Sequence, residues 1–155
     1  MSQSGKSFMV EDARLLFRNF SGEEGPFNRK GDRSFCVVVT PEVAEKLSSD
    51  GWNVKKLQSA EEGDDPTYHV QVAVNFSNRP PKIVMITSTG RTYLDESSVN
   101  VLDWADIKLA DLIARGYDWV VNGKVGVKAY LQSLFVTIEE DALDLKYATY
   151  NEEPS

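Results

Sequence analysis

The sequence is poor in the residues from which metal sites and nucleophilic catalytic sites are built. It contains one cysteine, Cys36, and one histidine, His69, among 155 residues. A single cysteine cannot form a disulfide within the chain, and one histidine with one cysteine cannot complete a usual zinc site. Cys36 lies in the apolar run FCVVVT and is expected to be buried. A Ser-His-Asp or Cys-His arrangement would need His69, which strand alternation places on a solvent-facing side. We therefore expect no metal site and no catalytic nucleophile.

Long apolar runs and phosphate-binding loops are absent as well. No apolar run approaches the roughly 20 residues of a membrane span, and the opening MSQSGKSF lacks the apolar centre of a signal peptide. The glycines at 22, 25 and 31 match neither GxxxxGK(S/T) nor GxGxxG. We therefore expect no cofactor, no membrane association and a cytosolic location. Neighbouring carboxylates fall in loops or near the C-terminus, where solvated charge is the ordinary explanation, so a two-metal nuclease is a minor alternative.

The excess of acidic over basic residues argues against a general nucleic-acid binder. The net charge is −7, whereas such binders usually carry a basic surface. Residues 139–155 account for −5 of this charge, which leaves −2 for the rest of the chain. The sequence therefore predicts a single domain at 1–138 followed by an acidic C-terminal tail at 139–155.

Alternation of apolar and polar residues with a period of two dominates the chain and predicts a mainly β fold. Strands are expected at 13–20, 35–39, 52–57, 68–76, 82–87, 107–119 and 124–138, with Asn122-Gly123 as a hairpin turn. Thr40 as N-cap and Pro41 at the first helical position predict one short helix, at about 41–50. Crossover helices are too few for a parallel sheet. We expect an OB-fold-like antiparallel β-barrel, closed or partly open, with one inserted helix.

The segment from Arg14 to Phe35 mixes aromatic and basic residues to an unusual degree. It holds four of the seven phenylalanines and five cationic residues. Alternation over 13–20 puts Phe17 on the core face and Arg14, Arg18 and Phe20 on the exposed face. The glycine-rich stretch that follows is expected to be a loop whose second half, 27–33, acts as a mobile clamp. The core is expected to hold four further aromatic residues, namely Phe35, Phe76, Trp104 and Phe135.

Aromatic rings interleaved with cations are suited to single-stranded nucleic acid, because rings stack on bases while cations neutralise phosphates. Three such groupings are expected to line one groove. They consist of Arg14, Arg18, Phe20, Phe27, Arg29, Lys30 and Arg33; of Arg79, Lys82, Arg91 and Tyr93; and of Trp119, Lys124, Lys128 and Tyr130, with Arg115 and Tyr117 nearby.

Three stretches resemble the single-stranded DNA-binding proteins of bacteriophages, particularly those of phages that infect actinobacteria. They are VEDARLLFRNFSGEEGPFNRKGDRSFCVVV, RPPKIVMITSTGRTYLDE and WVVNGKVGVKAYLQSLFVTIEED, which together with their surroundings cover nearly the whole chain. The resemblance implies an OB fold, a non-enzymatic role in phage DNA replication or recombination, and a location in the host cytoplasm. It also implies that the acidic tail recruits replication or recombination proteins.

Two other functions fit the same pattern of residues. An RNA-binding module would use the same stacking and phosphate contacts. A protein–protein interaction module, such as a phage structural or inhibitor protein, could use the aromatic loop as its contact surface. Self-association through an edge strand such as 52–57 is also open.

Overall fold

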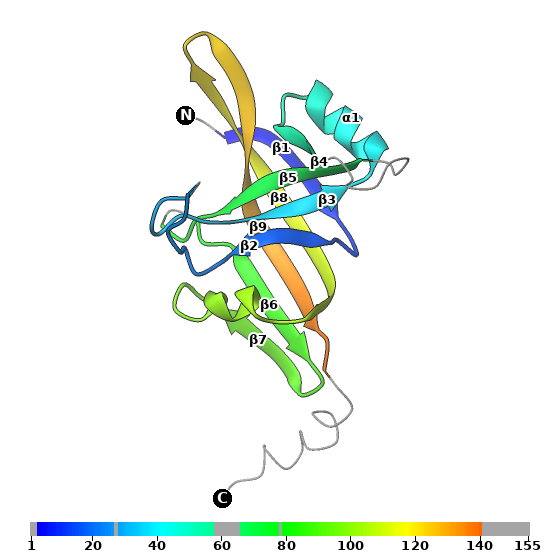
Figure 1. Cartoon of the computed structure of the whole chain (residues 1–155), viewed down its shortest axis with the longest axis vertical. Helices are drawn as coiled ribbons and strands as arrows, with labels where there is room; N and C mark the ends of the chain where they lie inside the picture. Colours follow the sequence, from blue (N-terminus) through cyan, green and yellow to red (C-terminus); the bar gives the residue numbers. More distant parts are fainter. Residues whose placement is uncertain (1–2, 27, 58–65, 78, 141–155) are drawn as a thin grey trace, which may run out of the picture.

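The computed structural model describes residues 3–26, 28–57, 66–77 and 79–140 of the chain, and it places them in a β-rich fold (Figure 1). In chain order the elements are β1 Gln3–Val10, β2 Leu15–Asn19, β3 Arg33–Val39, α1 Pro41–Ser49, β4 Val54–Leu57, β5 Thr67–Val74, β6 Lys82–Thr87, β7 Gly90–Leu94, the 3-10 helix η1 Val99–Asp103, β8 Ile107–Val121 and β9 Lys124–Ile138. The predicted mainly β, OB-like fold with one inserted α-helix is confirmed.

The strands form one strongly bent sheet that is not closed into a complete barrel. Its main order is β1-β8-β9-β5-β3-β2, while β4 pairs with β5, and β6 pairs with both β7 and β9. Most pairings are antiparallel, as expected, but β9 runs parallel to β5 and to β6. The reason is the length of β9, whose 15 residues pass first beside β5 and then beside β6. One long strand thus connects the two halves of the sheet.

The helix α1 forms where local signals predict it. The Thr40 hydroxyl accepts a hydrogen bond from the Val43 amide at 3.2 Å, and Pro41 occupies the first turn. Ala44 and Leu47 are buried in the core beside Trp52. Trp52 packs edge to face with Phe8 of β1, a strand that alternation did not predict, with the ring centroids 4.9 Å apart.

The predicted sides of Phe17 and Phe20 on β2 are wrong, because a bulge interrupts the alternation. Leu16 pairs with Cys36 and Asn19 with Ser34, so β2 has one extra residue between these pairs. Phe17 occupies the bulge with a left-handed φ of 51° and is 63% exposed. Beyond the bulge the faces are exchanged, and Phe20 is completely buried, with its ring stacked on that of Phe35 at 5.3 Å. Phe20 is therefore a core residue and is not available to a ligand.

Three other expected positions differ in the structure. An irregularity in the β8–β9 register falls between Leu131 and Ser133, so Leu134 turns into the core and Phe135 is left half-buried on the opposite side. Trp104 is 73% exposed because it follows η1 rather than lying within a strand. His69, expected to face solvent, is buried beneath the ring of Phe17.

The β8–β9 hairpin extends beyond the body of the sheet (Figure 1). Asn122 and Gly123 form its turn with φ values of 50° and 81°, which is the left-handed pair that a type I′ turn requires. Val121 pairs with Lys124 across this turn, and the predicted hairpin is confirmed. The domain boundary at 138 stays a prediction, because most of the predicted tail, residues 141–155, lies outside the described residues.

Candidate nucleic-acid interface

The side of the sheet that faces away from the core carries a groove. Residues paired across strands project to the same face, so Cys36 and Gln71, and Ala73 and Tyr130, share this outer face. The groove has a volume of about 560 Å³. It runs over β3 and β5 to the base of the β8–β9 hairpin, and the β2–β3 loop forms its opposite wall. A groove of this kind, between an open sheet face and two loops, can accommodate an extended chain.

Trp119 occupies the hairpin side of the groove and rests on a glycine. Its cross-strand partner is Gly126, and a β-carbon added to Gly126 would lie 2.4 Å from Cζ2 of the indole. Since no real β-carbon approaches so closely, only glycine permits this position of the ring. The indole is thus backed by the strand on one side.

Tyrosines and cations alternate along the next part of β8 and β9. The rings of Tyr117 and Tyr130 meet edge to face at 5.0 Å, with the Lys128 ammonium 5.1 Å from the centre of the Tyr130 ring. The Arg115 guanidinium lies 5.7 Å from the centre of the Tyr117 ring. Hydrogen bonds from Arg115 and Arg79 to the Tyr117 hydroxyl lower its pKa. This arrangement presents aromatic rings and positive charge to the same side of the sheet.

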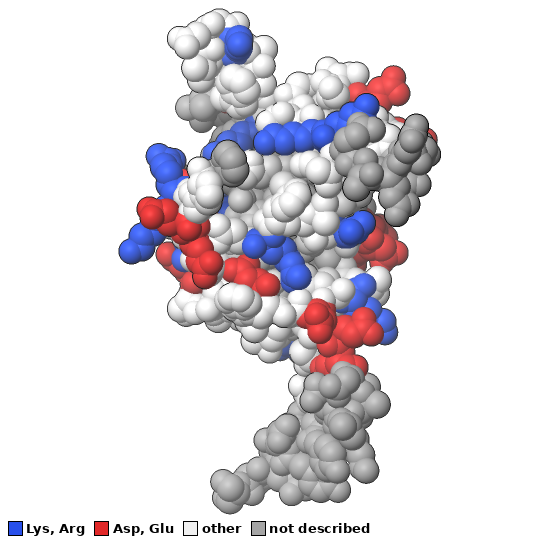
Figure 2. Space-filling view, viewed as in Figure 1, with Lys and Arg blue, Asp and Glu red and all other residues white. Residues whose placement is uncertain are grey.

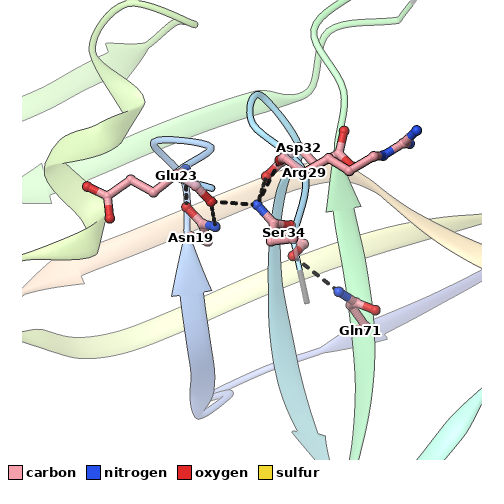
Figure 3. Close-up of polar contacts among 7 residues, drawn as sticks. Asn19, Glu23, Arg29, Asp32, Ser34 and Gln71 are labelled. Atoms are coloured by element: carbon pink, nitrogen blue, oxygen red, sulfur yellow. Dashed lines mark hydrogen bonds and ion pairs between the residues drawn. The ribbon is translucent and has the colours of Figure 1, made fainter. Parts of the chain in front are cut away.

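Hydrogen bonds hold the β2–β3 loop in a defined shape. The Asn28 side-chain amide donates to the carbonyls of Glu23, Asp32 and Arg29 at 2.7, 3.0 and 3.1 Å. Figure 3 shows this network beside β3 and β5, where Gln71 donates to the Ser34 hydroxyl at 3.2 Å. The described part of this loop forms a wall of the groove, and the mobile clamp at 27–33 stays a prediction.

Two of the predicted cations in this wall are partly engaged within the protein. Arg29 is exposed and forms an ion pair with Asp32 at 3.2 Å. Arg33 donates from Nε to the carbonyl of Phe20 at 3.0 Å, and its guanidinium lies 3.6 Å from the Glu96 carboxylate. Exposed ion pairs such as that of Arg29 are weak, so this guanidinium can exchange its partner for a phosphate at little cost.

A second hollow of about 480 Å³ adjoins the groove near η1. Phe17 and Trp104 line it, and it shares Asn28, Ser34 and Gln71 with the groove. Arg18 also lines it, but one of its amino groups donates to two backbone carbonyls of the η1 segment.

The structure brings only some of the predicted residues together. Those that line the groove are Arg29, Arg33, Trp119, Lys128 and Tyr130, and Arg18 lines the adjoining hollow. Arg79 hydrogen-bonds to the hydroxyl of Tyr117, and the Tyr117 ring contacts that of Tyr130 in the groove. Four others are exposed but line neither the groove nor the adjoining hollow, namely Arg14, Lys30, Lys124 and Arg91. Phe20 is buried, and Phe27 lies outside the described residues.

Lys82 and Tyr93 belong to a separate aromatic patch on β6, β7 and the end of β9. The Lys82 ammonium lies 5.8 Å from the centre of the Tyr93 ring and 5.5 Å from that of Phe135. Phe135 lies five positions after Tyr130 on β9, which corresponds to about 17 Å of strand. Contrary to the prediction, Lys82 and Tyr93 of the middle grouping therefore do not line the groove.

Sequence reasoning missed several residues of the interface. Phe17 was assigned to the core because the bulge in β2 could not be foreseen. Trp104 was assigned to the core because the segment before it has no clear pattern. Asn28, Gln71 and Gly126 gave no aromatic or basic signal, although Gly126 opposite an aromatic residue in a hairpin is a recognisable pattern.

Charge is mixed over the surface that carries these features. On the face drawn in Figure 2, basic and acidic side chains are interspersed over the body of the molecule. Within the described ranges, no three His, Cys, Asp or Glu side chains come together as metal ligands. The described helices include none with the length and apolar character needed to cross a membrane. Burial raises the pKa of the Cys36 thiol, although the charge of Lys55 opposes this shift.

Comparisons with known proteins identify the family. Residues 1–153 match the family of phage ssDNA-binding domains, and the chain belongs to this family. The predicted resemblance to phage single-stranded DNA-binding proteins is thereby confirmed. No curated protein sequence matches the chain.

Two solved structures of a phage Enc34 protein show the same fold, and a T7 protein is a more distant structural match. The single-stranded DNA-binding protein from bacteriophage Enc34 is 9% identical with a TM-score of 0.57, over 89% of this chain and 84% of that chain. The Enc34 protein in complex with ssDNA is 8% identical with a TM-score of 0.56, over 89% of each chain. The single-stranded DNA-binding protein gp2.5 of bacteriophage T7 is 11% identical with a TM-score of 0.43, over 97% of each chain. The two Enc34 structures agree with the OB-like sheet described above.

Proposed function

We propose that this protein binds single-stranded DNA without sequence preference during phage DNA replication and recombination. The family supports the ligand, and the groove supports the mode of binding. Trp119 and Tyr130 offer rings to bases of any kind, and Lys128 and Arg29 lie in the same groove to neutralise phosphates. This combination within one groove is the observation that carries the proposal.

The proposed activity requires no chemical step. Stacking and phosphate contacts are equilibrium interactions, and an open sheet face lets a strand enter without a free end. We therefore propose a non-enzymatic role in the host cytoplasm. Incubation of labelled DNA with magnesium or manganese should leave it intact, and cleavage that co-purifies with the protein would favour a nuclease instead.

Fluorescence titration tests the binding mode directly. Quenching of tryptophan emission by poly-dT, repeated at several salt concentrations, should give log affinity falling linearly with log salt, with a slope of about −0.7 per phosphate neutralised. Lys128→Ala should reduce this slope by about 0.7. Lys108→Ala is the matched control, because Lys108 is an exposed lysine on β8 that lines neither hollow. A titration that shows no binding at any salt would refute the proposed function.

Competition between DNA and RNA oligomers of the same sequence separates the proposal from its nearest alternative. We expect DNA to compete more strongly, whereas equal or stronger competition by RNA would favour an RNA-binding module. Absence of binding to either would favour a protein–protein interaction module.

The acidic segment after β9 is proposed to compete with DNA for the groove and to recruit replication or recombination proteins. Residues 139–155 carry a net charge of −5, which repels phosphate and is attracted to the same cations. Deletion of residues 141–155 should raise the affinity for short oligonucleotides at low salt, and an unchanged affinity would contradict the competition. Self-association through an edge strand is a further proposal that sedimentation of the full chain would test.

A further inference from the structure

The second hollow contains two highly exposed aromatic rings. Phe17 is 63% exposed and Trp104 is 73% exposed, and both line this hollow. Large apolar side chains on a soluble protein are normally turned inward when the strand permits it. Here the backbone instead turns the side chain of Phe17 outward.

Phe17 is held outward by strained backbone. Its left-handed φ of 51° is uncommon for an aromatic residue, and such conformations cluster at ligand-binding sites. The ring meets the buried His69 edge to face, with the centroids 5.9 Å apart. His69 thus supports one part of the ring while most of it is open to the hollow.

Trp104 is fixed by hydrogen bonds on both sides of it in the chain. Nη1 of Arg18 donates to the carbonyls of Leu102 and Ala105, both at 2.8 Å. The Asp103 carboxylate accepts from the amide of Phe20 at 2.6 Å and from the amide and hydroxyl of Ser21 at 3.0 and 2.7 Å. These contacts join the η1 segment to β2 and its following turn, and hence hold Trp104 and Phe17 at the same hollow.

The charges of this hollow do not favour a phosphate. Arg18 is the cation among the lining residues, and its Nη1 already serves two carbonyls. Glu23 and Glu24 are exposed at the rim. A bound strand would therefore keep its phosphates away from this rim and direct its bases toward the two rings.

The hollow shares part of its wall with the groove. Asn28, Ser34 and Gln71 line both, and Gln71 and Ser34 are joined by a hydrogen bond at their boundary. A strand lying in the groove can therefore extend one end into the hollow.

We propose that the second hollow is a stacking subsite for unpaired bases, which adds affinity without neutralising phosphate. It rests on the proposed function and deepens it, because it divides the interface into an electrostatic part and a stacking part. Oligonucleotides too short to reach beyond the groove do not use the subsite, and longer ones do.

Variants without these rings test the subsite by DNA length and by salt. Phe17→Gly removes the ring and suits the left-handed backbone, so the bulge is retained. Combined with Trp104→Ala, it should weaken binding of long oligothymidylates by about 5- to 150-fold for each stacked base lost. The shortest oligothymidylates that bind should keep their wild-type affinity. The salt slope for long ones should be unchanged, since no phosphate contact is lost.

Controls distinguish loss of the subsite from loss of the fold. Met9→Ala removes a side chain of equal exposure, 63%, from β1 outside both hollows, and should bind all lengths as wild type does. Phe17→Tyr with Trp104 intact should restore the length dependence. An equal loss at every length with an unaltered melting temperature, or a reduced salt slope, would overturn the subsite.

The outcomes separate the subsite from the proposed function. If the wild-type protein binds no oligothymidylate, the proposed function fails. If it binds and the Phe17→Gly/Trp104→Ala variant shows the same dependence on length, only the subsite is refuted. If this variant does not fold, Trp104→Ala alone, on an exposed side chain, gives the deciding length series.

Discussion

Alanine at Gly126 should weaken binding of single-stranded DNA through its effect on Trp119. The added β-carbon would lie 2.4, 2.6 and 2.9 Å from Cζ2, Cε2 and Nε1 of the indole, so the ring must leave its place. The backbone itself should accept alanine, because Gly126 is not among the glycines with a left-handed φ. The substitution therefore displaces the ring and leaves the strand in place.

The expected size of the effect follows from the loss of one stacked base. Such a contact is worth about 1–3 kcal/mol, and about 1.4 kcal/mol corresponds to a tenfold change in affinity. Gly126→Ala should thus weaken binding by about 5- to 150-fold. Thermal stability should change less, since Trp119 is half-buried and does not belong to the core cluster.

Fluorescence anisotropy of a labelled oligothymidylate measures this affinity, and a double-mutant cycle assigns its cause. Gly126→Ala should have no further effect in a protein that already carries Trp119→Ala. Val125→Ala is the matched control, because Val125 adjoins Gly126 on β9, is 74% exposed and lines neither hollow. The reasoning is refuted if Gly126→Ala binds as tightly as wild type, or if it weakens binding equally when Trp119 is absent.

Two further predictions concern stability and order. Lowering the pH through about 6.5 should reduce the free energy of unfolding, because burial, and next the charge of Lys55, hold the pKa of folded His69 below that of the unfolded chain. His69 is the chain's one histidine, so urea unfolding of His69→Gln should lose this slope, and a slope that persists would contradict the assignment. Asn28→Ala removes hydrogen bonds to three carbonyls of the β2–β3 loop and should lower the unfolding free energy by about 1–2 kcal/mol. Faster hydrogen exchange of the amides in this loop would show that Asn28 orders it, and unchanged exchange would contradict that role.

Local signals in the sequence were sufficient for the elements that local physics determines. Thr40 and Pro41 begin α1, and Asn122-Gly123 forms the β8–β9 turn, because each motif satisfies its own backbone requirements. Clean alternation predicted β5 within two residues at either end. The mainly β fold follows from these elements together.

Faces and neighbours were harder to predict, because they depend on register. One extra residue in β2 exchanges its two faces, and nothing in the alternating run of residues 13–20 marks the position of that residue. A similar irregularity in β9 moved Phe135 out of the core. The parallel pairing of β9 with β5 and β6 is non-local, and no turn motif announces it.

The register irregularity in β2 also explains why the interface could not be read from aromatic residues alone. Phe17 and Phe20 are three residues apart and chemically identical, yet Phe20 is in the core and Phe17 lines the second hollow. Without the bulge, the core would receive Phe17, and the ring of Phe20 would lie outside the pair with Phe35. The bulge thus completes the core and supplies the exposed ring by one change of backbone. Because both results depend on it, a substitution that removes the bulge should cost stability and binding together, whereas Phe17→Gly should cost binding alone.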